Sequence, residues 1–220
     1  MNKKELIKKI EAEAKKYFVG ASGCHDWTHV ERVRALALRI GKKEKADLFV
    51  VEAAALLHDI GRKAEMKSKG LFCHAEKGAE TAKVVLKKMG LGKDEIENIV
   101  HCISTHRFRK SNIPETLEAK VLFDADKMDS IGAIGVARLF VFSGNVGSNN
   151  LYTGNEKKLA NDGKDYSYTK EDSALLEYYK KVQYVHKRAL TKEGKKIAKE
   201  RHEFMKGYFS RFNKEVKGKL

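Results

Sequence analysis

The chain of 220 residues is 42% hydrophobic and 34% charged, and it contains a single proline. These values exclude a disordered or fibrous chain and favour one folded, mostly helical core. No apolar run approaches the roughly 18 residues that cross a bilayer, and the N-terminus lacks the apolar centre of a signal peptide. We therefore expect a cytoplasmic protein without a membrane partner. The formal net charge of +15 attracts anions, from polynucleotides to small phosphorylated substrates.

The chain contains three cysteines, Cys24, Cys73 and Cys102, at wide spacing. An odd number of cysteines so far apart makes a poor disulfide framework and fits a reducing compartment. No second cysteine follows at the short spacing that a cysteine-based zinc site requires. We therefore expect reduced thiols.

Helical periodicity governs the first part of the chain. His29 falls on the apolar stripe of the second expected helix, so its side chain should face the core, where it could also be an ordinary buried histidine. The third expected helix is apolar nearly all round, which is typical of a central helix, and its last turn carries His58 and Asp59. The expected limits of these helices are up to about Tyr17, from about Thr28, and about residues 45–60.

Two further expected helices carry histidines. His74 lies at the start of the fourth helix, on the side that also carries Gly78. At about 100° per residue, His106 lies some 20° from the apolar stripe of the fifth helix, whereas His101 points roughly opposite. We therefore expect His106 to face inward and His101 to face water. The expected ranges are about residues 74–89 and 94–106.

A sixth helix is expected from about residue 115 into the 130s, and its aspartates differ in direction. Asp126 aligns with the apolar row that includes Ala119, while Asp124 lies about 160° from that row, so Asp126 is the candidate ligand. Asp129 comes one turn later. We expect Asp129 either to contact substrate or a histidine beside the metal, or to be a surface charge paired with a lysine.

The last third of the chain begins with a long segment, about residues 145–170, that shows no helical pattern. Such a segment is either a functional loop or inert. Helices over about residues 171–215 are expected to form a pair that packs on the core. No repeat or strand pattern is present, so we predict one all-α domain over residues 1–220 with its core at about 21–144.

The clearest chemical pattern is an ordered set of ligand types, namely His29, the pair His58-Asp59, and Asp126. Imidazole and carboxylate together suit a divalent cation. His58 and Asp59 end an apolar run in which neither is easily desolvated alone, so a charge partner is required. A cation held between the helices would supply one, and a metal with open positions activates water for hydrolysis.

Three stretches carry a family resemblance. They are His25-Asp26-Trp27-Thr28-His29, Leu56-Leu57-His58-Asp59-Ile60-Gly61 and Asp124-Ala125-Asp126-Lys127-Met128-Asp129. In this order they resemble the HD superfamily of metal-dependent phosphohydrolases, and residues 190–212 look like its small single-domain branch. The resemblance implies an all-α helical bundle with a divalent metal held by His29, His58, Asp59 and Asp126.

The ligand types favour Mn²⁺, Fe²⁺, Co²⁺ or Ni²⁺ over Mg²⁺. His74 and His106 resemble the histidines that hold a second ion, together with the bridging aspartate, in bimetallic branches of the superfamily. We expect a mononuclear centre in which these two histidines form hydrogen bonds or bind substrate phosphate. A second ion is the alternative, and a diiron oxygenase would require it.

Basic side chains follow the expected ligands along the chain. They are Arg62, Lys63, Arg107 and Lys127. We expect these side chains, with Asp129, to bind the substrate, and we expect Lys63 to act beside Asp59 in catalysis. Each of them singly could instead be a surface charge.

The resemblance also narrows the reaction. The 5′-nucleotidase branch carries a glutamate where this chain has Arg62, so nucleoside monophosphatase activity is not expected. The pattern is similar to the branch that includes nucleoside triphosphate pyrophosphohydrolases. We therefore predict a metal-dependent phosphohydrolase that acts on a nucleotide or a related phosphate ester. The alternatives are a dinuclear-metal phosphodiesterase, a diiron oxygenase and a basic nucleic-acid-binding protein, although no base-stacking pattern supports specific nucleic-acid binding.

Overall fold

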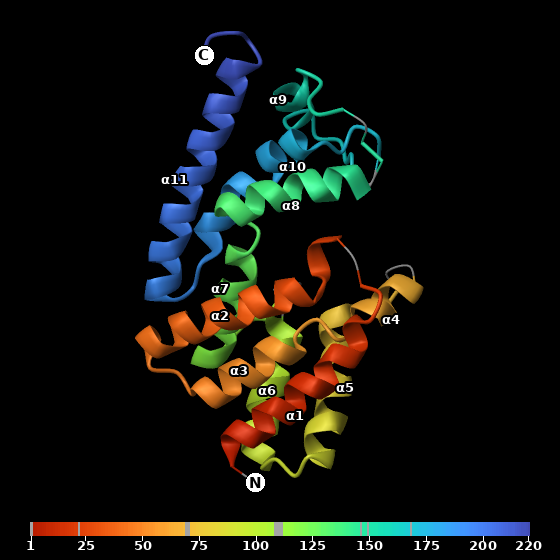
Figure 1. The fold of residues 1–220 in the computed structure, drawn as a ribbon, viewed down its shortest axis with the longest axis vertical. Helices are drawn as coiled ribbons and strands as arrows, with labels where there is room; N and C mark the ends of the chain where they lie inside the picture. The colour runs from red at the N-terminus through yellow and green to blue at the C-terminus, as the bar shows by residue number, and fades with distance from the viewer. Residues whose placement is uncertain are drawn as a thin grey trace. The chain divides into compact units, whose positions relative to one another are not determined.

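The structure is a computed structural model that describes residues 2–21, 23–68, 71–107, 112–145, 147–148, 150–167 and 169–220. Every regular element in these ranges is a helix, which confirms the predicted all-α class (Figure 1). The chain forms two compact units, one of residues 1–126 with 190–194 and one of residues 127–189 with 195–220. Within the described ranges, no helix has the length and apolar character needed to span a membrane.

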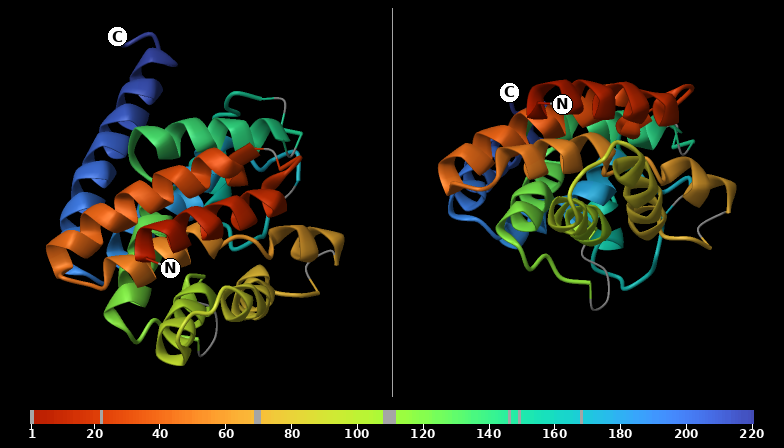
Figure 2. Two further views of the ribbon diagram at one scale, coloured as in Figure 1. Left: turned by 60° about the horizontal axis from the view of Figure 1, so that its bottom comes forward. Right: turned by 90° about the horizontal axis from the view of Figure 1, so that it is seen from below.

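The first unit is built around a short apolar helix, α3. Its buried side chains include three consecutive alanines, Ala53, Ala54 and Ala55, which let neighbouring helices approach closely. It packs against α1, α2 and α6, and α5 pairs with α6 (Figure 2). The helices of this unit are α1 (Lys3–Lys15), α2 (Trp27–Glu44), α3 (Leu48–Leu57), α4 (Arg62–Lys67), α5 (His74–Lys88), α6 (Lys93–Thr105) and most of α7 (Leu117–Met128). Two 3₁₀ turns, η1 (Lys16–Phe18) and η2 (Gly23–His25), join α1 to α2.

Side-chain caps fix where α2 and α3 begin. The Asp26 carboxylate accepts a hydrogen bond from the His29 amide at 3.1 Å and so starts α2 one turn before that histidine. Asp47 caps α3 in the same way, through the amides of Phe49 and Val50. Because an N-cap fixes the phase of the first helical turn, Asp26 determines which way His29 points.

Helix α3 ends at Leu57, three residues before the expected limit at residue 60. A tight turn of residues 58–61 follows, and it is pressed against the start of α5. A Cβ atom at Gly61 would lie 2.1 Å from the His74 carbonyl oxygen and 2.6 Å from the Gly78 amide nitrogen. Glycine is therefore required here by the close approach of two backbones.

The helix expected from residue 115 into the 130s is interrupted, so this prediction is wrong in its extent. Helix α7 ends at Met128, and α8 begins at Gly132. Gly132 has a φ of 79°, which the interior of a right-handed helix cannot contain, so α7 cannot continue into α8. A Cβ atom at Gly135 would lie 2.4 Å from the Ser130 carbonyl oxygen, so the two glycines together allow the sharp turn. Asp129 lies in this turn.

The second unit contains α8 (Gly132–Asn145), α9 (Glu156–Leu159), α10 (Ala174–Lys180), the 3₁₀ helix η3 (Val182–Arg188) and most of α11 (Lys192–Glu215). The Tyr178 ring stacks on the Phe209 ring with centroids 4.0 Å apart, which joins α10 to α11. The first member of the helical pair expected over about residues 171–215 is interrupted, because Lys181 adopts a φ of −131° and separates α10 from η3. The segment expected to be irregular contains α9, and its residues 146, 149 and 168 lie outside the described residues.

Candidate metal centre

The histidines and aspartates singled out from the sequence come together in the first unit. They occupy the ends of different helices: His29 in the first turn of α2, His58 and Asp59 just after α3, His74 at the start of α5, His106 just after α6, and Asp126 in the last turn of α7. All are buried except Asp126, whose side chain is 11% exposed. Residues far apart in the sequence therefore enclose one polar centre within an apolar core.

The Asp59 carboxylate lies in the middle of this centre. Its Oδ2 atom is 3.6 Å from the Nε2 atoms of both His29 and His58. Its Oδ1 atom is 3.3 Å from His74 Nε2 and 3.5 Å from His106 Nε2. Each oxygen thus faces its own pair of histidines, and Oδ1 has no hydrogen-bond partner among the described residues although it is buried.

Asp126 adds a second carboxylate on the side of Asp59 that faces His29 and His58. Its Oδ1 atom is 3.5 Å from His29 Nε2 and 4.0 Å from His58 Nε2, while the two Nε2 atoms are 3.2 Å apart. On the other side, His74 Nε2 and His106 Nε2 are likewise 3.2 Å apart. The described residues therefore contain side-chain groups that could hold a metal ion on either side of Asp59.

Hydrogen bonds on the far side of two rings determine which nitrogen faces the centre. His58 Nδ1 lies 2.8 Å from the Ala55 carbonyl oxygen, and His106 Nδ1 lies 2.6 Å from the Ile103 carbonyl oxygen. A carbonyl oxygen can only accept, so Nδ1 carries the proton in both rings. Their Nε2 lone pairs then point at a carboxylate, which also only accepts. A cation between them satisfies all of these atoms at once.

The protonation states agree with this geometry. Burial lowers the pKa of His58 to about 4 and that of His74 to about 3, so both rings are neutral near pH 7. Burial alone would raise the pKa of Asp59, but the Arg62 guanidinium and the neighbouring imidazoles hold it well below its usual range. Neutral imidazoles and an ionised carboxylate are the forms that bind a divalent metal.

A carboxylate that the sequence analysis did not single out holds His74. Glu65 in α4 approaches His74 Nδ1 at 2.7 Å, and the Arg107 guanidinium donates to the other Glu65 oxygen at 2.5 Å. A carboxylate behind a histidine fixes its tautomer and orients its Nε2 atom. Glu65 follows Asp59 by six positions in a separate short helix, so no periodicity links the two in the sequence.

The basic side chains expected to bind substrate already have partners within the protein. Arg62 Nε donates to Asp59 Oδ2 at 2.5 Å, and Lys63 Nζ donates to the Val19 carbonyl oxygen at 2.5 Å. Arg107 contacts Glu65. Their roles in substrate binding stay predictions. Among them, Arg62 and Lys63 border open space next to Asp59.

That open space is a cavity of about 210 Å³ beside the Asp59 carboxylate. Asp59 and His25 are the members of the histidine and aspartate cluster that line it. Its remaining walls come from η1 with the residues that follow it and from α4. They are Tyr17, Phe18, Gly20, Ala21, Arg62, Lys63, Glu65 and Met66.

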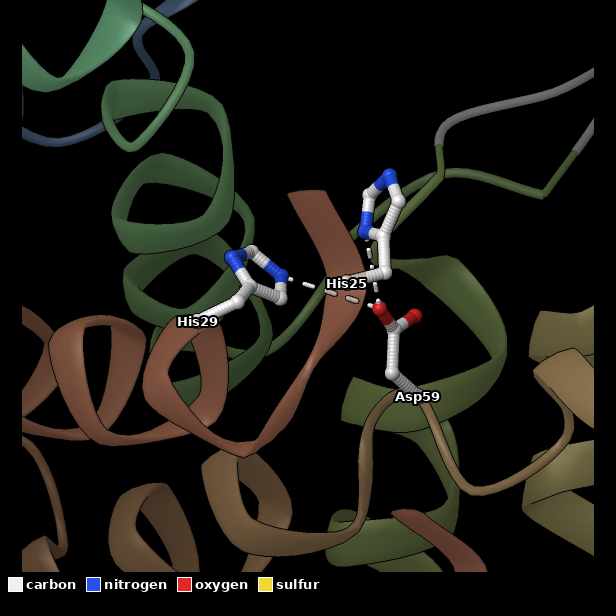
Figure 3. Close-up of side chains that lie close together, drawn as sticks. All are labelled: His25, His29 and Asp59. Atoms are coloured by element: carbon white, nitrogen blue, oxygen red, sulfur yellow. Dashed lines mark ion pairs between the residues drawn. The ribbon is translucent and has the colours of Figure 1, made fainter. Parts of the chain in front are cut away.

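His25 was not among the ligands selected from the sequence, yet it lies at the cluster. Its Nδ1 atom is 3.4 Å from Asp59 Oδ2, and burial lowers its pKa to about 4. Figure 3 shows that His25 and His29 approach the Asp59 carboxylate from different directions. Its place four residues before His29 in the first matching stretch could have drawn attention to it.

Two predicted substrate residues, Lys127 and Asp129, belong to the second unit. Asp129 was expected either at the site or on the surface beside a lysine. It is buried instead, and it accepts a hydrogen bond from the Arg138 guanidinium at 2.5 Å. The surface alternative is therefore wrong, because the turn between α7 and α8 directs this side chain inward. The contacts of Asp129 and Lys127 with substrate stay predictions.

His101 on α6 and His106 directly after it follow the expected helical phase in part. His106 is buried, which confirms its inward direction. His101 was expected to face water, but it is half-buried and its Nε2 atom accepts a hydrogen bond from the Glu115 amide at 3.0 Å. The segment that precedes α7 covers the face of α6 that periodicity alone would leave in water.

The chain belongs to the HD domain family, whose model matches residues 26–131. It is 33% identical over 201 residues to the uncharacterized protein YpgQ of Bacillus subtilis, an alignment that covers 90% of this chain and 87% of that protein. The solved structure of YpgQ in complex with ADP has a TM-score of 0.75 at 31% identity, over 98% of this chain and 97% of the other. A solved HD-superfamily hydrolase from Bacillus thuringiensis has a TM-score of 0.74 at 25% identity, over 98% and 99% of the two chains. These similarities confirm the predicted family and its helical fold.

Proposed function

We propose that this protein is a phosphohydrolase that uses divalent transition metals to cleave a nucleotide, with a nucleoside triphosphate as the substrate and pyrophosphate as a product. The observation that carries the proposal is the arrangement around Asp59, where histidine Nε2 atoms face both oxygens of one ionised carboxylate. Such an arrangement of acceptors suits cations with hydrolytic chemistry better than it suits a structural core.

We infer two ions, where the sequence analysis expected one, because candidate ligands lie on both sides of Asp59. His29, His58 and Asp126 would hold one ion with Asp59 Oδ2, and His74 and His106 would hold the other with Asp59 Oδ1. Bound ions of this kind polarise a phosphoryl oxygen and lower the pKa of a bound water. The contacts with Ala55, Ile103 and Glu65 described above orient the Nε2 atoms of His58, His106 and His74 toward the centre.

The cavity beside Asp59 supports an anionic substrate. Arg62 and Lys63 line it together with the aromatic side chains Tyr17 and Phe18. At about 210 Å³, it is smaller than the roughly 300 Å³ at which drug-sized pockets begin, so it would hold part of a nucleotide rather than all of it. We assign the phosphate contacts to Arg62 and Lys63, because both lie at the border with Asp59.

Two further observations favour a nucleotide. YpgQ, which covers nearly the whole chain, has been solved with ADP. The formal net charge of +15 raises the local concentration of phosphorylated molecules around the protein. A substrate that carries several negative charges benefits most from this field.

A product analysis tests the proposal. The purified protein, loaded with Mn²⁺, Co²⁺ or Ni²⁺, is incubated with a panel of nucleoside tri-, di- and monophosphates. Release of pyrophosphate with the nucleoside monophosphate is expected. Orthophosphate released from a monophosphate would instead show a nucleotidase, and no product above that of a His58→Ala/Asp59→Ala double variant would refute nucleotide hydrolysis.

A second candidate function is the hydrolysis of a phosphodiester by the same centre. It is favoured by the histidines that face both oxygens of Asp59. Two ions held there could stabilise the attacking and the leaving oxygen of an in-line displacement. Cyclic and linear dinucleotides added to the same panel separate the two candidates. Turnover of a dinucleotide without turnover of a triphosphate would favour the phosphodiesterase.

A further inference from the structure

His25 has a fixed position at the entrance to α2. It ends η2, and the following residue, Asp26, caps α2 through the His29 amide at 3.1 Å and accepts from the Thr28 hydroxyl at 2.7 Å. The cap holds the backbone on the C-terminal side of His25. As a result, the His25 and His29 rings lie 5.2 Å apart at an interplanar angle of 84°.

The inward-facing ring nitrogen of His25 lacks a hydrogen-bond partner within the described part of the chain. Its Nδ1 atom is buried and has no hydrogen-bond partner among the described residues. Asp59 Oδ2 lies 3.4 Å away, without the alignment of a hydrogen bond. A buried polar atom without a partner is costly, so an absent group that it binds is the simplest physical account.

The spacing of the nearby atoms fits a cation. His25 Nδ1 and His29 Nε2 lie 3.4 Å and 3.6 Å from the same oxygen of Asp59. The three ligand atoms are all within 4.8 Å of one another. Neighbouring ligands about 2.1 Å from one ion are separated by roughly 3 Å when their bonds are perpendicular, so a small contraction around an ion would satisfy all three.

We propose that His25 is a further ligand, through Nδ1, of the ion that His29 and Asp59 would hold. This inference rests on the metal centre proposed above. With His58 and Asp126, the ion would have three imidazole and two carboxylate donors. The cavity that His25 and Asp59 line would give water or substrate access to this ion. Three imidazoles would also strengthen the preference for a transition metal over Mg²⁺.

The test compares His25→Leu with His25→Asn in the full-length chain. Leucine has a similar volume and removes the donor atom. Asparagine keeps a donor atom, because its carbonyl oxygen lies as many bonds from Cβ as Nδ1 of histidine does. The readouts are the Co²⁺ affinity, by competition with a chelator, and the visible absorption spectrum of the bound Co²⁺. We expect His25→Leu to bind one Co²⁺ at least about 10-fold more weakly with an altered spectrum, and His25→Asn to recover part of the affinity.

Two controls make the outcomes distinguishable. His101→Ala removes a half-buried histidine that is not part of the cluster and should leave both readouts unchanged. Asp59→Ala should abolish tight binding. If His25→Leu keeps the native affinity and spectrum while Asp59→Ala loses them, His25 is not a ligand and the metal centre stands. If Asp59→Ala also keeps them, the proposed centre itself is wrong. Far-ultraviolet circular dichroism of each metal-free variant confirms folding, and should His25→Leu not fold, a native spectrum in folded His25→Ala overturns the proposal.

Discussion

A single carboxylate, Asp59, links the two halves of the polar cluster. Because each of its oxygens faces a separate pair of histidines, its loss would affect both cation positions, whereas the loss of one histidine would affect one. The groups that contact the Nδ1 atoms of the histidines then determine how each ring is oriented. For His74 that residue is Glu65, and Arg107 in turn holds Glu65.

Glu65→Gln should weaken the ion on the side of His74 and spare the other. The glutamine carbonyl oxygen can still accept from Nδ1, but the negative charge that raises the basicity of the ring and attracts Arg107 is lost. We expect the affinity for the second Mn²⁺ to fall by about 10-fold to 100-fold, measured by calorimetric titration. Glu80→Gln, which removes an exposed partner of Lys77, serves as the control. Equal weakening of both ions would contradict the role of Glu65.

At the scale of the helices, α7 carries two aspartates with different surroundings. Asp126 faces His29 at 3.5 Å. Asp124 is buried and accepts hydrogen bonds from the amides of Leu190 and Thr191, both at 2.8 Å, and from the Thr191 hydroxyl at 2.6 Å. One aspartate therefore belongs to the polar cluster, and the other anchors the segment of residues 190–194.

Replacement of the two aspartates should separate metal binding from stability. Asp124→Ala leaves three donors, two of them buried, without their acceptor, and we expect a loss of about 2 to 4 kcal/mol in the free energy of unfolding. Asp126→Ala should remove one bound metal and cost the metal-free protein little. Urea unfolding of the metal-free variants and metal analysis of the loaded variants provide the two measurements. A metal loss in folded Asp124→Ala with full occupancy in Asp126→Ala would reverse the assignment.

At the scale of the whole molecule, the stability of the fold is linked to pH through buried groups outside the cluster. Cys102 on α6 is fully buried, and burial raises the pKa of its thiol above the ordinary value. The thiol therefore stays neutral in the folded chain at a pH where it ionises in the unfolded chain. Its contribution to stability is complete below the ordinary thiol pKa and is lost as the pH rises toward the raised value.

The free energy of unfolding should accordingly fall more steeply with pH in the wild type than in Cys102→Ala. Above about pH 8.5, the difference between the two slopes should approach about 1.4 kcal/mol per pH unit. Urea unfolding between pH 7 and pH 10 in the presence of a reductant measures both slopes. Other titrating groups are common to the two proteins, so parallel curves would show that the thiol ionises equally well in the folded state.

Periodicity in the sequence was sufficient for residues that lie on regular helices. His29 and His106 are buried as the phase of their helices predicts. The break between α7 and α8 was not predictable in this way, because it depends on the positive φ of Gly132 and on a contact between Gly135 and the Ser130 carbonyl oxygen. Both are tertiary or conformational constraints that a hydrophobic pattern does not record.

The residues that the sequence analysis missed lie on short elements. Glu65 is on a helix of six residues, and His25 ends a 3₁₀ turn of three residues. Neither element is long enough to show an apolar stripe, so no phase could be assigned to these side chains. Their position at the cluster follows from how the chain turns after α1 and after Asp59.

The absence of a side chain at Gly61 allows the turn that carries Asp59 to lie directly against the start of α5, which carries His74. The turn that carries Asp59 and the helix that begins with His74 touch backbone to backbone there, so closely that a Cβ atom on residue 61 would stand 2.1 Å from the His74 carbonyl oxygen. The distance between the Asp59 carboxylate and His74 is therefore set by a contact between main-chain atoms, which cannot adapt as a side-chain rotamer can. In the proposed centre, ions of different radius would meet the same distance, so Gly61, which binds no metal, would contribute to the selection among them.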